Sequence, residues 1–148
     1  VGRPAVIIND RPDIALLAGA DGVHVGQGDL PVEACRRVMG AGAIVGVSTS
    51  SIEQARAALR DGASYVGLGP MYPSTTKAKP ALAGVDYLRA YLADEGLRGL
   101  PHLAISGIDA ERARALAAAG CRGVAVSSAV CSAEDPEGAV REIVGHFS

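Results

Sequence analysis

Short apolar runs recur along the whole chain and alternate with longer stretches of mixed polarity. The runs cover residues 5–9, 22–26, 43–48, 65–69, 102–106 and 123–127. Within each run apolar residues follow one another instead of alternating with polar ones, which is typical of strands buried on both faces of a parallel sheet. The pattern therefore predicts six buried β-strands.

The stretches between these runs carry the signals that start and end helices. Serine, aspartate and proline residues stand where helices are expected to begin, and glycines stand where they are expected to end. The start signals are Pro31, Ser50 paired with Glu53 as a capping box, Asp109, and Asp135 with Pro136. Strands and helices therefore alternate, and repeated βα units form parallel sheets joined by crossovers.

Repeated βα units leave two architectures, an open doubly wound sheet and a (β/α)8 barrel. Nearly every apolar run ends in a small or polar residue, which predicts polar groups all around one rim, where barrel active sites lie. A dinucleotide-binding sheet instead concentrates glycines after its first strand, and no GxGxxG motif occurs there. The pattern favours an α/β fold of the (β/α)8, or TIM barrel, type.

A barrel of this type needs eight strands, and the pattern supplies six. We therefore expect residues 1–148 to form a single partial TIM-barrel domain with six βα units, corresponding to strands 3 to 8. The chain begins at Val1, almost directly on a strand, and we expect two further units to precede it in the natural protein. The alternative is a barrel completed by another chain, including a further copy of this one.

Composition narrows the classes of function. Hydrophobic residues make up 49% of the 148 residues, with no Trp and one Phe, so Val, Ile, Leu and Ala must build the core. A formal net charge of -2 gives no basic surface for nucleic acid, and no apolar run reaches membrane-spanning length. The three cysteines lack paired spacing and are expected to be reduced. We expect a cytoplasmic enzyme or binding domain without nucleic-acid or membrane partners.

Two acidic residues follow the first two predicted strands. Asp10, preceded by Asn9, ends the first strand, and Asp29 follows the second. Each is suited simply to cap a helix, because aspartate is a good N-cap residue. Together, on adjacent strands of one rim, the two carboxylates are also suited to share a Mg²⁺ ion that carries substrate phosphates. The residues alone leave both interpretations open.

The last two predicted strands end near Gly107 and Ser128. The loops after the last two strands of a barrel often bind phosphate through backbone N–H groups. A tight turn is the simpler interpretation of residues 106–108 taken alone. The presence of both features in the last two units favours a phosphate-binding rim at the C-terminal ends of the strands.

The segment from Gly67 to Pro80 is too long for a plain βα connection. Its hydroxyls and amines come from Ser74, Thr75, Thr76, Lys77 and Lys79. Such a loop, taken alone, is most often only solvated. At the end of a barrel strand it is instead typical of a lid or a ligand-binding loop.

The two histidines of the predicted strands are expected to be structural. His24 lies inside the second predicted strand and His102 at the start of the fifth, away from the reactive rim. Neither is assigned a catalytic role.

These motifs occur together and in order over nearly the whole chain. They are the segments 7–30, GVSTSS at 46–51, YVGLGPMYPSTTK at 65–77, AISGI at 104–108 and GVAVSSAV at 123–130. In this the chain resembles the thiamine-phosphate synthase family. The resemblance implies a TIM-barrel transferase of thiamine biosynthesis, which joins an aminopyrimidine diphosphate to a thiazole phosphate and releases pyrophosphate. In that family pyrophosphate leaves first, and the thiazole nitrogen captures the pyrimidine carbocation.

The resemblance also implies roles for individual residues. It implies Mg²⁺ as the cofactor, bound by Asp10 and Asp29, and assigns catalysis to Lys77 and Ser48 beside the pyrophosphate. The residues that it implies for substrate binding are Asn9, Ser74, Thr76, Lys77, Gly107, Ser127 and Ser128. Asn9 would contact the pyrophosphate. Thr76 would contact the thiazole phosphate, together with Gly107, Ser127 and Ser128.

The chain departs from the family pattern at two positions. Ser74 replaces the usual first Thr of the loop motif and keeps a hydroxyl. Ser106 replaces the first Gly of the usual Ala-Ile-Gly-Gly-Ile, where it fits if its backbone angle φ is negative. The family's pyrimidine-recognising Gln and its pyrophosphate-binding Arg and Lys belong to the first two strands. We therefore expect the chain alone to be inactive.

A thiazole tautomerase of the same barrel superfamily is the nearest alternative. That family tends to place a His just after the strand, where this chain has Thr49 and Ser50. A barrel fragment that binds phosphate without catalysis is the second alternative. Pyrophosphate release from both substrates with Mg²⁺ distinguishes the synthase from both.

Overall fold

All six expected strands are present in the computed structural model, which describes residues 3–74 and 81–147. The strands are β1 (Ile7–Asn9), β2 (Gly22–Val25), β3 (Ile44–Thr49), β4 (Tyr65–Leu68), β5 (His102–Ile105) and β6 (Val124–Ala125). Every neighbouring pair is parallel, and the order in the sheet is the order in the chain. The prediction of a parallel α/β fold is confirmed.

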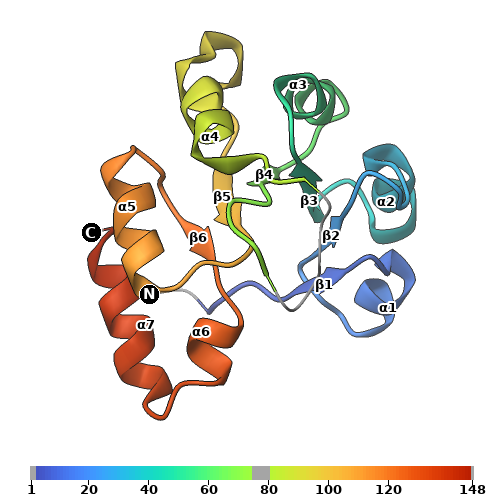
Figure 1. Ribbon diagram of the computed structural model, residues 1–148. Helices are drawn as coiled ribbons and strands as arrows, with labels where there is room; N and C mark the ends of the chain where they lie inside the picture. The colour runs from blue at the N-terminus through green and yellow to red at the C-terminus, as the bar shows by residue number, and fades with distance from the viewer. Residues whose placement is uncertain (1–2, 75–80, 148) are drawn as a thin grey trace.

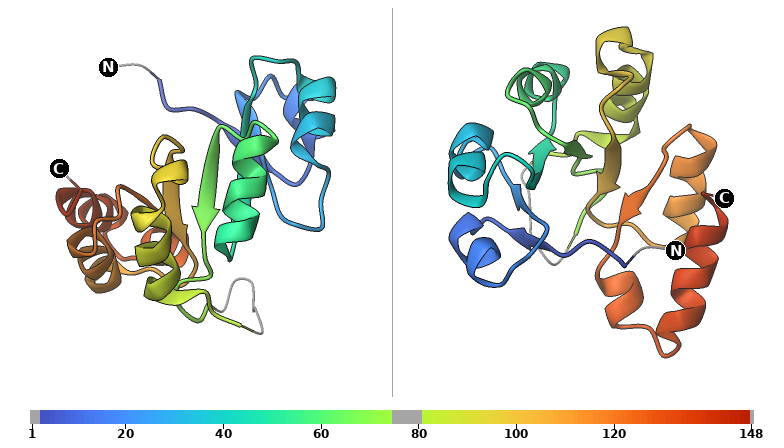
Figure 2. Two further views of the ribbon diagram at one scale, coloured as in Figure 1. Left: turned by 90° about the horizontal axis from the view of Figure 1, so that it is seen from above. Right: turned by 180° about the vertical axis from the view of Figure 1, so that it is seen from behind.

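Helices separate the strands and lie on the outside of the curled sheet (Figure 1). They are α1 (Pro12–Leu17), α2 (Val32–Met39), α3 (Ile52–Arg60), α4 (Gly84–Ala93), α5 (Ala110–Ala118), α6 (Ser128–Cys131) and α7 (Pro136–Gly145), with the 3₁₀ helix η1 (Glu95–Leu97). Figure 2 shows the same ring of helices from behind. A doubly wound sheet carries helices on both faces and reverses its strand order, so the fold is the curled, barrel-like alternative. None of the helices formed by the described residues is long and apolar enough to cross a membrane.

The starts of α3, α5 and α7 follow the sequence signals, with a shift of one residue at α3. Asp109 and Asp135 cap α5 and α7, each accepting a hydrogen bond from a backbone N–H three residues further on. The cap of α3 is Ser51 and not Ser50, because Ser51 accepts from the N–H of Gln54. The side chain of Gln54 in turn accepts from the N–H of Ser50. The predicted capping box is therefore wrong by one position, since two adjacent serines offer the sequence two similar registers.

Alternation along the strands gives the sheet two different faces. Val23, Val45 and Val66 are fully buried and belong to the apolar core. The neighbouring positions include His24 and Ser48, which line a cavity. Because successive side chains of a strand point to opposite faces, the valines define one face and the polar residues the other. Small aliphatic residues thus build the core, and the cavity side of the sheet carries polar groups together with apolar residues such as Leu103 and Ile105.

Strands β1 and β6 form the two edges of the sheet in the described part of the chain. Apolar side chains are exposed on the helices that follow each edge strand: Leu17 of α1 is 87% exposed, and Val140 and Val144 of α7 are 44% and 55% exposed. The two valines also line an apolar hollow of about 280 Å³ that includes Val124 of β6. An apolar hollow, unlike a single exposed side chain, is a surface that a partner is suited to cover.

Candidate active site

A cavity of about 720 Å³ opens at the carboxyl ends of the strands. Every strand contributes to its lining, with its last residues or with the loop that follows. Those predicted site residues that the structure describes all line it: Asn9, Asp10, Asp29, Ser48, Ser74, Gly107, Ser127 and Ser128. Thr76 and Lys77, together with the rest of the expected lid at 75–80, lie outside the described residues. The fold therefore brings together residues that the sequence keeps far apart, while their individual roles stay predictions.

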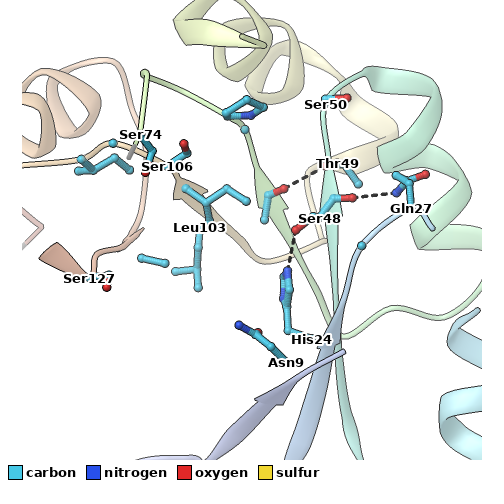
Figure 3. Close-up of a pocket in the computed structure, with 18 of the residues that line it drawn as sticks. Asn9, His24, Gln27, Ser48, Thr49, Ser50, Ser74, Leu103, Ser106 and Ser127 are labelled. Atoms are coloured by element: carbon cyan, nitrogen blue, oxygen red, sulfur yellow. Dashed lines mark hydrogen bonds between the residues drawn. The ribbon is translucent and has the colours of Figure 1, made fainter. Parts of the chain in front are cut away.

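His24 lines this cavity and points toward Ser48 (Figure 3), and hydrogen bonds connect it to two other strands. Its Nε2 lies 2.9 Å from Oγ of Ser48, and its Nδ1 lies 2.9 Å from the hydroxyl of Tyr65. Burial lowers the pKa of His24, and the Asp10 carboxylate opposes this to a smaller extent. Burial also raises the pKa of Tyr65. The two residues are therefore a neutral imidazole and a neutral phenol near pH 7.

A glycine makes room for this arrangement. Gly46 lies between β2 and β4 in the sheet, paired with His24 on one side and Tyr65 on the other. A Cβ atom at this position would overlap the ring of Tyr65 and Nδ1 of His24. Any larger residue at Gly46 would therefore displace the imidazole from Ser48.

The sequence motifs did not single out three residues that build this part of the site. His24 was expected to be packed, and Tyr65 and Gln27 were assigned no role. Gln27 lines the cavity, and its side-chain amide donates to the carbonyl of Ser48 over 2.8 Å. For His24 a signal was available: it alternates with the buried Val23 and Val25, so the period of two places its side chain on the polar face.

The two carboxylates do not cap helices. The N-cap of α1 is Arg11, without a side-chain cap, and Asp10 precedes it with φ +64°. The N-cap of α2 is Pro31, and Asp29 instead accepts the N–H of Gly26 through Oδ2 over 2.7 Å. The simpler interpretation of both residues is therefore wrong. In the residues that the structure describes, neither carboxylate forms an ion pair.

The cavity lining includes oxygen ligands of the kind that magnesium prefers. Asp10, Asp29 and the amide of Asn9 offer hard oxygen ligands along one lining. Among the described residues no three His, Cys, Asp or Glu side chains gather into a metal-binding group. Mg²⁺ commonly uses only one or two carboxylates and completes its shell with water and substrate phosphates. Two carboxylates in an open cavity are consistent with that pattern.

Ser106, in the loop after β5, does not have the negative φ under which serine was expected to fit. Its φ is instead +81°. A non-glycine residue in this region costs roughly 1 kcal/mol. The serine is held there by its hydroxyl, which donates to the carbonyl of Tyr72 over 3.1 Å.

Gly107 is required by its surroundings. Its φ is +65°, and a Cβ there would overlap the carbonyl oxygen of Pro73. None of the hydrogen bonds between described residues uses the N–H of Gly107 or of Ile108. Two unused backbone donors in a cavity wall are suited to an anion.

Thr49 occupies the position where a tautomerase tends to have histidine, and its hydroxyl is structural. The side chain is 2% exposed, and its Oγ1 accepts from the hydroxyl of Tyr87 over 2.8 Å. The neighbouring Ser50 is bonded to Gln54. Neither residue is a titratable acid or base near neutral pH, which argues against proton-transfer chemistry at this point.

Comparison with known proteins points to a single family. A family model described as thiamine monophosphate synthase matches residues 3–130. The thiamine-phosphate synthases of Chlorobium luteolum and Methanocella arvoryzae are 49% and 45% identical to this chain, each over 138 residues. Each match covers 93% of this chain and 64% of the relative. The chain therefore spans less than two thirds of the length of these curated relatives.

Solved structures agree in fold. The thiamine phosphate pyrophosphorylase from Pyrococcus furiosus has a TM-score of 0.80 at 34% identity, covering 95% of this chain and 66% of that one. The 3-hexulose-6-phosphate synthase from Salmonella typhimurium has a TM-score of 0.68 at 24% identity, covering 93% of this chain and 67% of that one. The second likeness concerns the fold alone.

Proposed function

The chain belongs to the thiamine monophosphate synthase family, and from that premise we propose that it serves the synthesis of thiamine phosphate. The reaction joins an aminopyrimidine (hydroxymethylpyrimidine) diphosphate to a hydroxyethylthiazole phosphate and releases pyrophosphate. One observation carries the proposal: a single cavity collects the acidic, hydroxyl and glycine residues that the family motifs assign to this chemistry. The chain would thus be a transferase of thiamine biosynthesis.

The first step breaks the bond between the pyrimidine's exocyclic carbon and the diphosphate oxygen, and the electron pair leaves with pyrophosphate. Asp10 and Asp29 would hold Mg²⁺, which when bound supplies charge neutralisation for the departing pyrophosphate. Lys77 and Asn9 would add a cation and an amide donor to the same group. The ring nitrogen of the thiazole then attacks the carbocation, a step that needs no general base.

Ser48 would donate a hydrogen bond to the departing pyrophosphate, and the hydrogen bonds of His24 prepare it to do so. If the Tyr65 hydroxyl donates to Nδ1 of His24, the proton of the neutral imidazole lies on Nε2 and is donated to Oγ of Ser48. The proton of the Ser48 hydroxyl is then free to be donated to a pyrophosphate oxygen. A bound anion favours this tautomer over the reverse one, because it needs a donor and not an acceptor.

The opposite side of the cavity would bind the phosphate of the thiazole substrate. The unused N–H groups of Gly107 and Ile108 support this assignment, and Ser127 and Ser128 line the same region. Ser74 and Thr76, from the loop after β4, would add hydroxyl donors. Binding the two phosphorylated groups at separate places would hold the thiazole nitrogen against the pyrimidine carbon.

We also propose that the curled sheet is part of an eight-stranded barrel, in which residues 1–148 form a single partial domain. Two further βα units would pair with the edges at β1 and β6 and cover the exposed Leu17, Val140 and Val144. The length of the relatives and the exposed apolar surface support this. Because those units carry further substrate-binding residues in the family, turnover is expected only in the completed barrel. A cytoplasmic location belongs to the same proposal.

Pyrophosphate release tests the function. Two proteins are compared: the 148-residue chain, and a fusion that adds the first two βα units of the Chlorobium luteolum synthase ahead of Val1. We expect Mg²⁺-dependent pyrophosphate release by the fusion when both substrates are present, and little by the chain alone. Isomerisation of a carboxylated thiazole phosphate by the fusion would indicate a tautomerase instead. Binding of thiazole phosphate by the fusion without turnover would indicate a binding domain.

A further inference from the structure

The loops after β4 and β5 are bonded to each other beside the cavity. The N–H of Tyr72 donates to the carbonyl of Ser106 over 3.2 Å, and the hydroxyl of Ser106 donates back to the carbonyl of Tyr72 over 3.1 Å. The carbonyl of Pro73 lies directly against Gly107. The backbone at the base of the first loop therefore packs on the second loop at the position proposed for the thiazole phosphate.

Arg112, in the first turn of α5, contacts both loops. Its Nη1 donates to the carbonyl of Gly107 over 2.6 Å, and its Cζ lies 4.9 Å from the centroid of the Tyr72 ring. Asp109 holds the other side of the guanidinium, with Oδ2 3.6 Å from Nε. The guanidinium thus combines a charged hydrogen bond with a cation–π contact, and its planar, forked group suits both at once better than the ammonium of lysine.

The bond to Gly107 has a consequence for the cavity wall. In a planar trans peptide the carbonyl of one residue and the N–H of the next point in opposite directions. By holding the carbonyl of Gly107, Arg112 also fixes the direction of the N–H of Ile108, which is therefore turned away from the guanidinium. Gly107 and Ile108 both line the cavity, whereas Arg112 does not. The arginine acts on the cavity only through the peptide that it orients.

We propose that Arg112 is a positioning residue that presets the phosphate-binding peptide at Gly107–Ile108 and joins it, through Tyr72, to the loop after β4. This rests on the proposed function, because it takes the phosphate of a thiazole phosphate as the ligand of that peptide. The residue makes no contact with the ligand itself. Its contribution is the orientation of a backbone donor that otherwise rotates more freely around a glycine.

The test compares ligand affinity among three variants of the completed-barrel fusion described above, measured by calorimetry. Arg112→Met removes the hydrogen bond and the charge, and Arg112→Lys keeps the charge but loses the planar guanidinium. Arg114→Met is the matched control, because Arg114 is an exposed arginine of the same helix. The ligands are hydroxyethylthiazole phosphate and the unphosphorylated hydroxyethylthiazole.

We expect Arg112→Met to weaken binding of the thiazole phosphate by roughly tenfold, the scale of one hydrogen bond to a charged ligand. Binding of the unphosphorylated thiazole should stay unchanged, Arg112→Lys should be intermediate, and Arg114→Met should equal wild type. Equal losses in Arg112→Met and Arg114→Met would show that charge alone matters and would overturn the inference.

Two further outcomes separate this inference from the proposed function. If wild type and Arg112→Met bind thiazole phosphate equally well, the role of Arg112 is wrong and the phosphate site stands. If wild type binds neither thiazole phosphate nor inorganic phosphate, the phosphate site itself is wrong, and the role of Arg112 is wrong with it. Thermal unfolding of each variant verifies that the compared proteins are folded.

Discussion

Nε2 of His24 lies 2.9 Å from Oγ of Ser48, across the boundary between β2 and β3. The family motifs place Ser48 beside the pyrophosphate and assign no role to His24. Because the other ring nitrogen is bonded to Tyr65, three strands contribute to one chain of hydrogen bonds. The orientation of Ser48 therefore depends on residues far away in the sequence.

We expect Ser48→Ala to lower kcat for pyrophosphate release by roughly tenfold in the completed barrel, because one donor to the departing group is lost. His24→Gln should lower kcat in the same direction, and the double variant should be little slower than Ser48→Ala alone, since both act through one hydroxyl. Ser50→Ala is the control, because its hydroxyl is already bonded to Gln54. Full additivity of the two changes would contradict the chain of hydrogen bonds.

The stability of the chain should depend on pH through two histidines. Burial lowers the pKa of His24 and of His102 below the ordinary value, and the nearby Arg122 lowers that of His102 further. The unfolded chain therefore takes up protons first, so the contribution of the neutral rings is complete above about pH 6.5 and is lost as the pH falls through the folded-state pKa values. Urea unfolding at about pH 7.5 and about pH 5.5 measures this.

A matched pair of variants tests whether these two histidines cause the pH dependence of the unfolding free energy. His24→Gln and His102→Gln should each reduce the loss of unfolding free energy between the two pH values. Only His24→Gln should also affect pyrophosphate release, because His102 lies at the start of β5, outside the cavity lining. An unchanged pH dependence in both variants would show that other groups are responsible.

The two carboxylates at the cavity rim yield a metal prediction. Asp10→Asn and Asp29→Asn in the completed barrel should each raise the Mg²⁺ concentration for half-maximal activity by at least roughly tenfold, because a charged oxygen ligand becomes neutral. The asparagine at position 29 can still accept the N–H of Gly26, so the loop is expected to persist. Asp13→Asn is the control, since Asp13 pairs with Arg11 and does not line the cavity. A shift of equal size in all three variants would argue against a specific site.

Helices and strands were predictable wherever residues close in the sequence determine them. The six strands are continuous apolar runs, and the caps at Asp109 and Asp135 each follow from one side chain and the turn beside it. The capping error at Ser50 arose because its neighbour offers the same chemistry one position later.

The site was predictable only in part, because its geometry is not local. Asp10 looked like a helix cap because its φ of +64° cannot be read from its neighbours. Ser106 has a positive φ and donates a hydrogen bond to Tyr72, 34 residues earlier in the chain, and neither feature can be read from its neighbours. The bond between His24 and Ser48 likewise follows from strand register, which single-strand patterns do not define.

The loop after β4 yields a prediction that rests on its sequence motif. Lys77→Ala in the completed barrel should lower kcat for pyrophosphate release by at least roughly tenfold, because the departing diphosphate loses a cation. Lys79→Ala removes the same charge two residues further on and should have little effect, since the family motif ends at Lys77. Equal effects of the two changes would mean that the loop contributes only general positive charge.

The strain at Ser106 yields a prediction about stability. Ser106→Ala keeps the positive φ but loses the hydrogen bond to Tyr72, so it should lower the unfolding free energy by about 1 kcal/mol. Ser106→Gly loses the same bond but relieves the backbone strain, so it should be more stable than Ser106→Ala by about 1 kcal/mol and close to wild type. Urea unfolding of the three proteins measures both differences. If alanine and glycine are equally stable at this position, the backbone of residue 106 is not strained, and the hydroxyl alone explains the choice of serine.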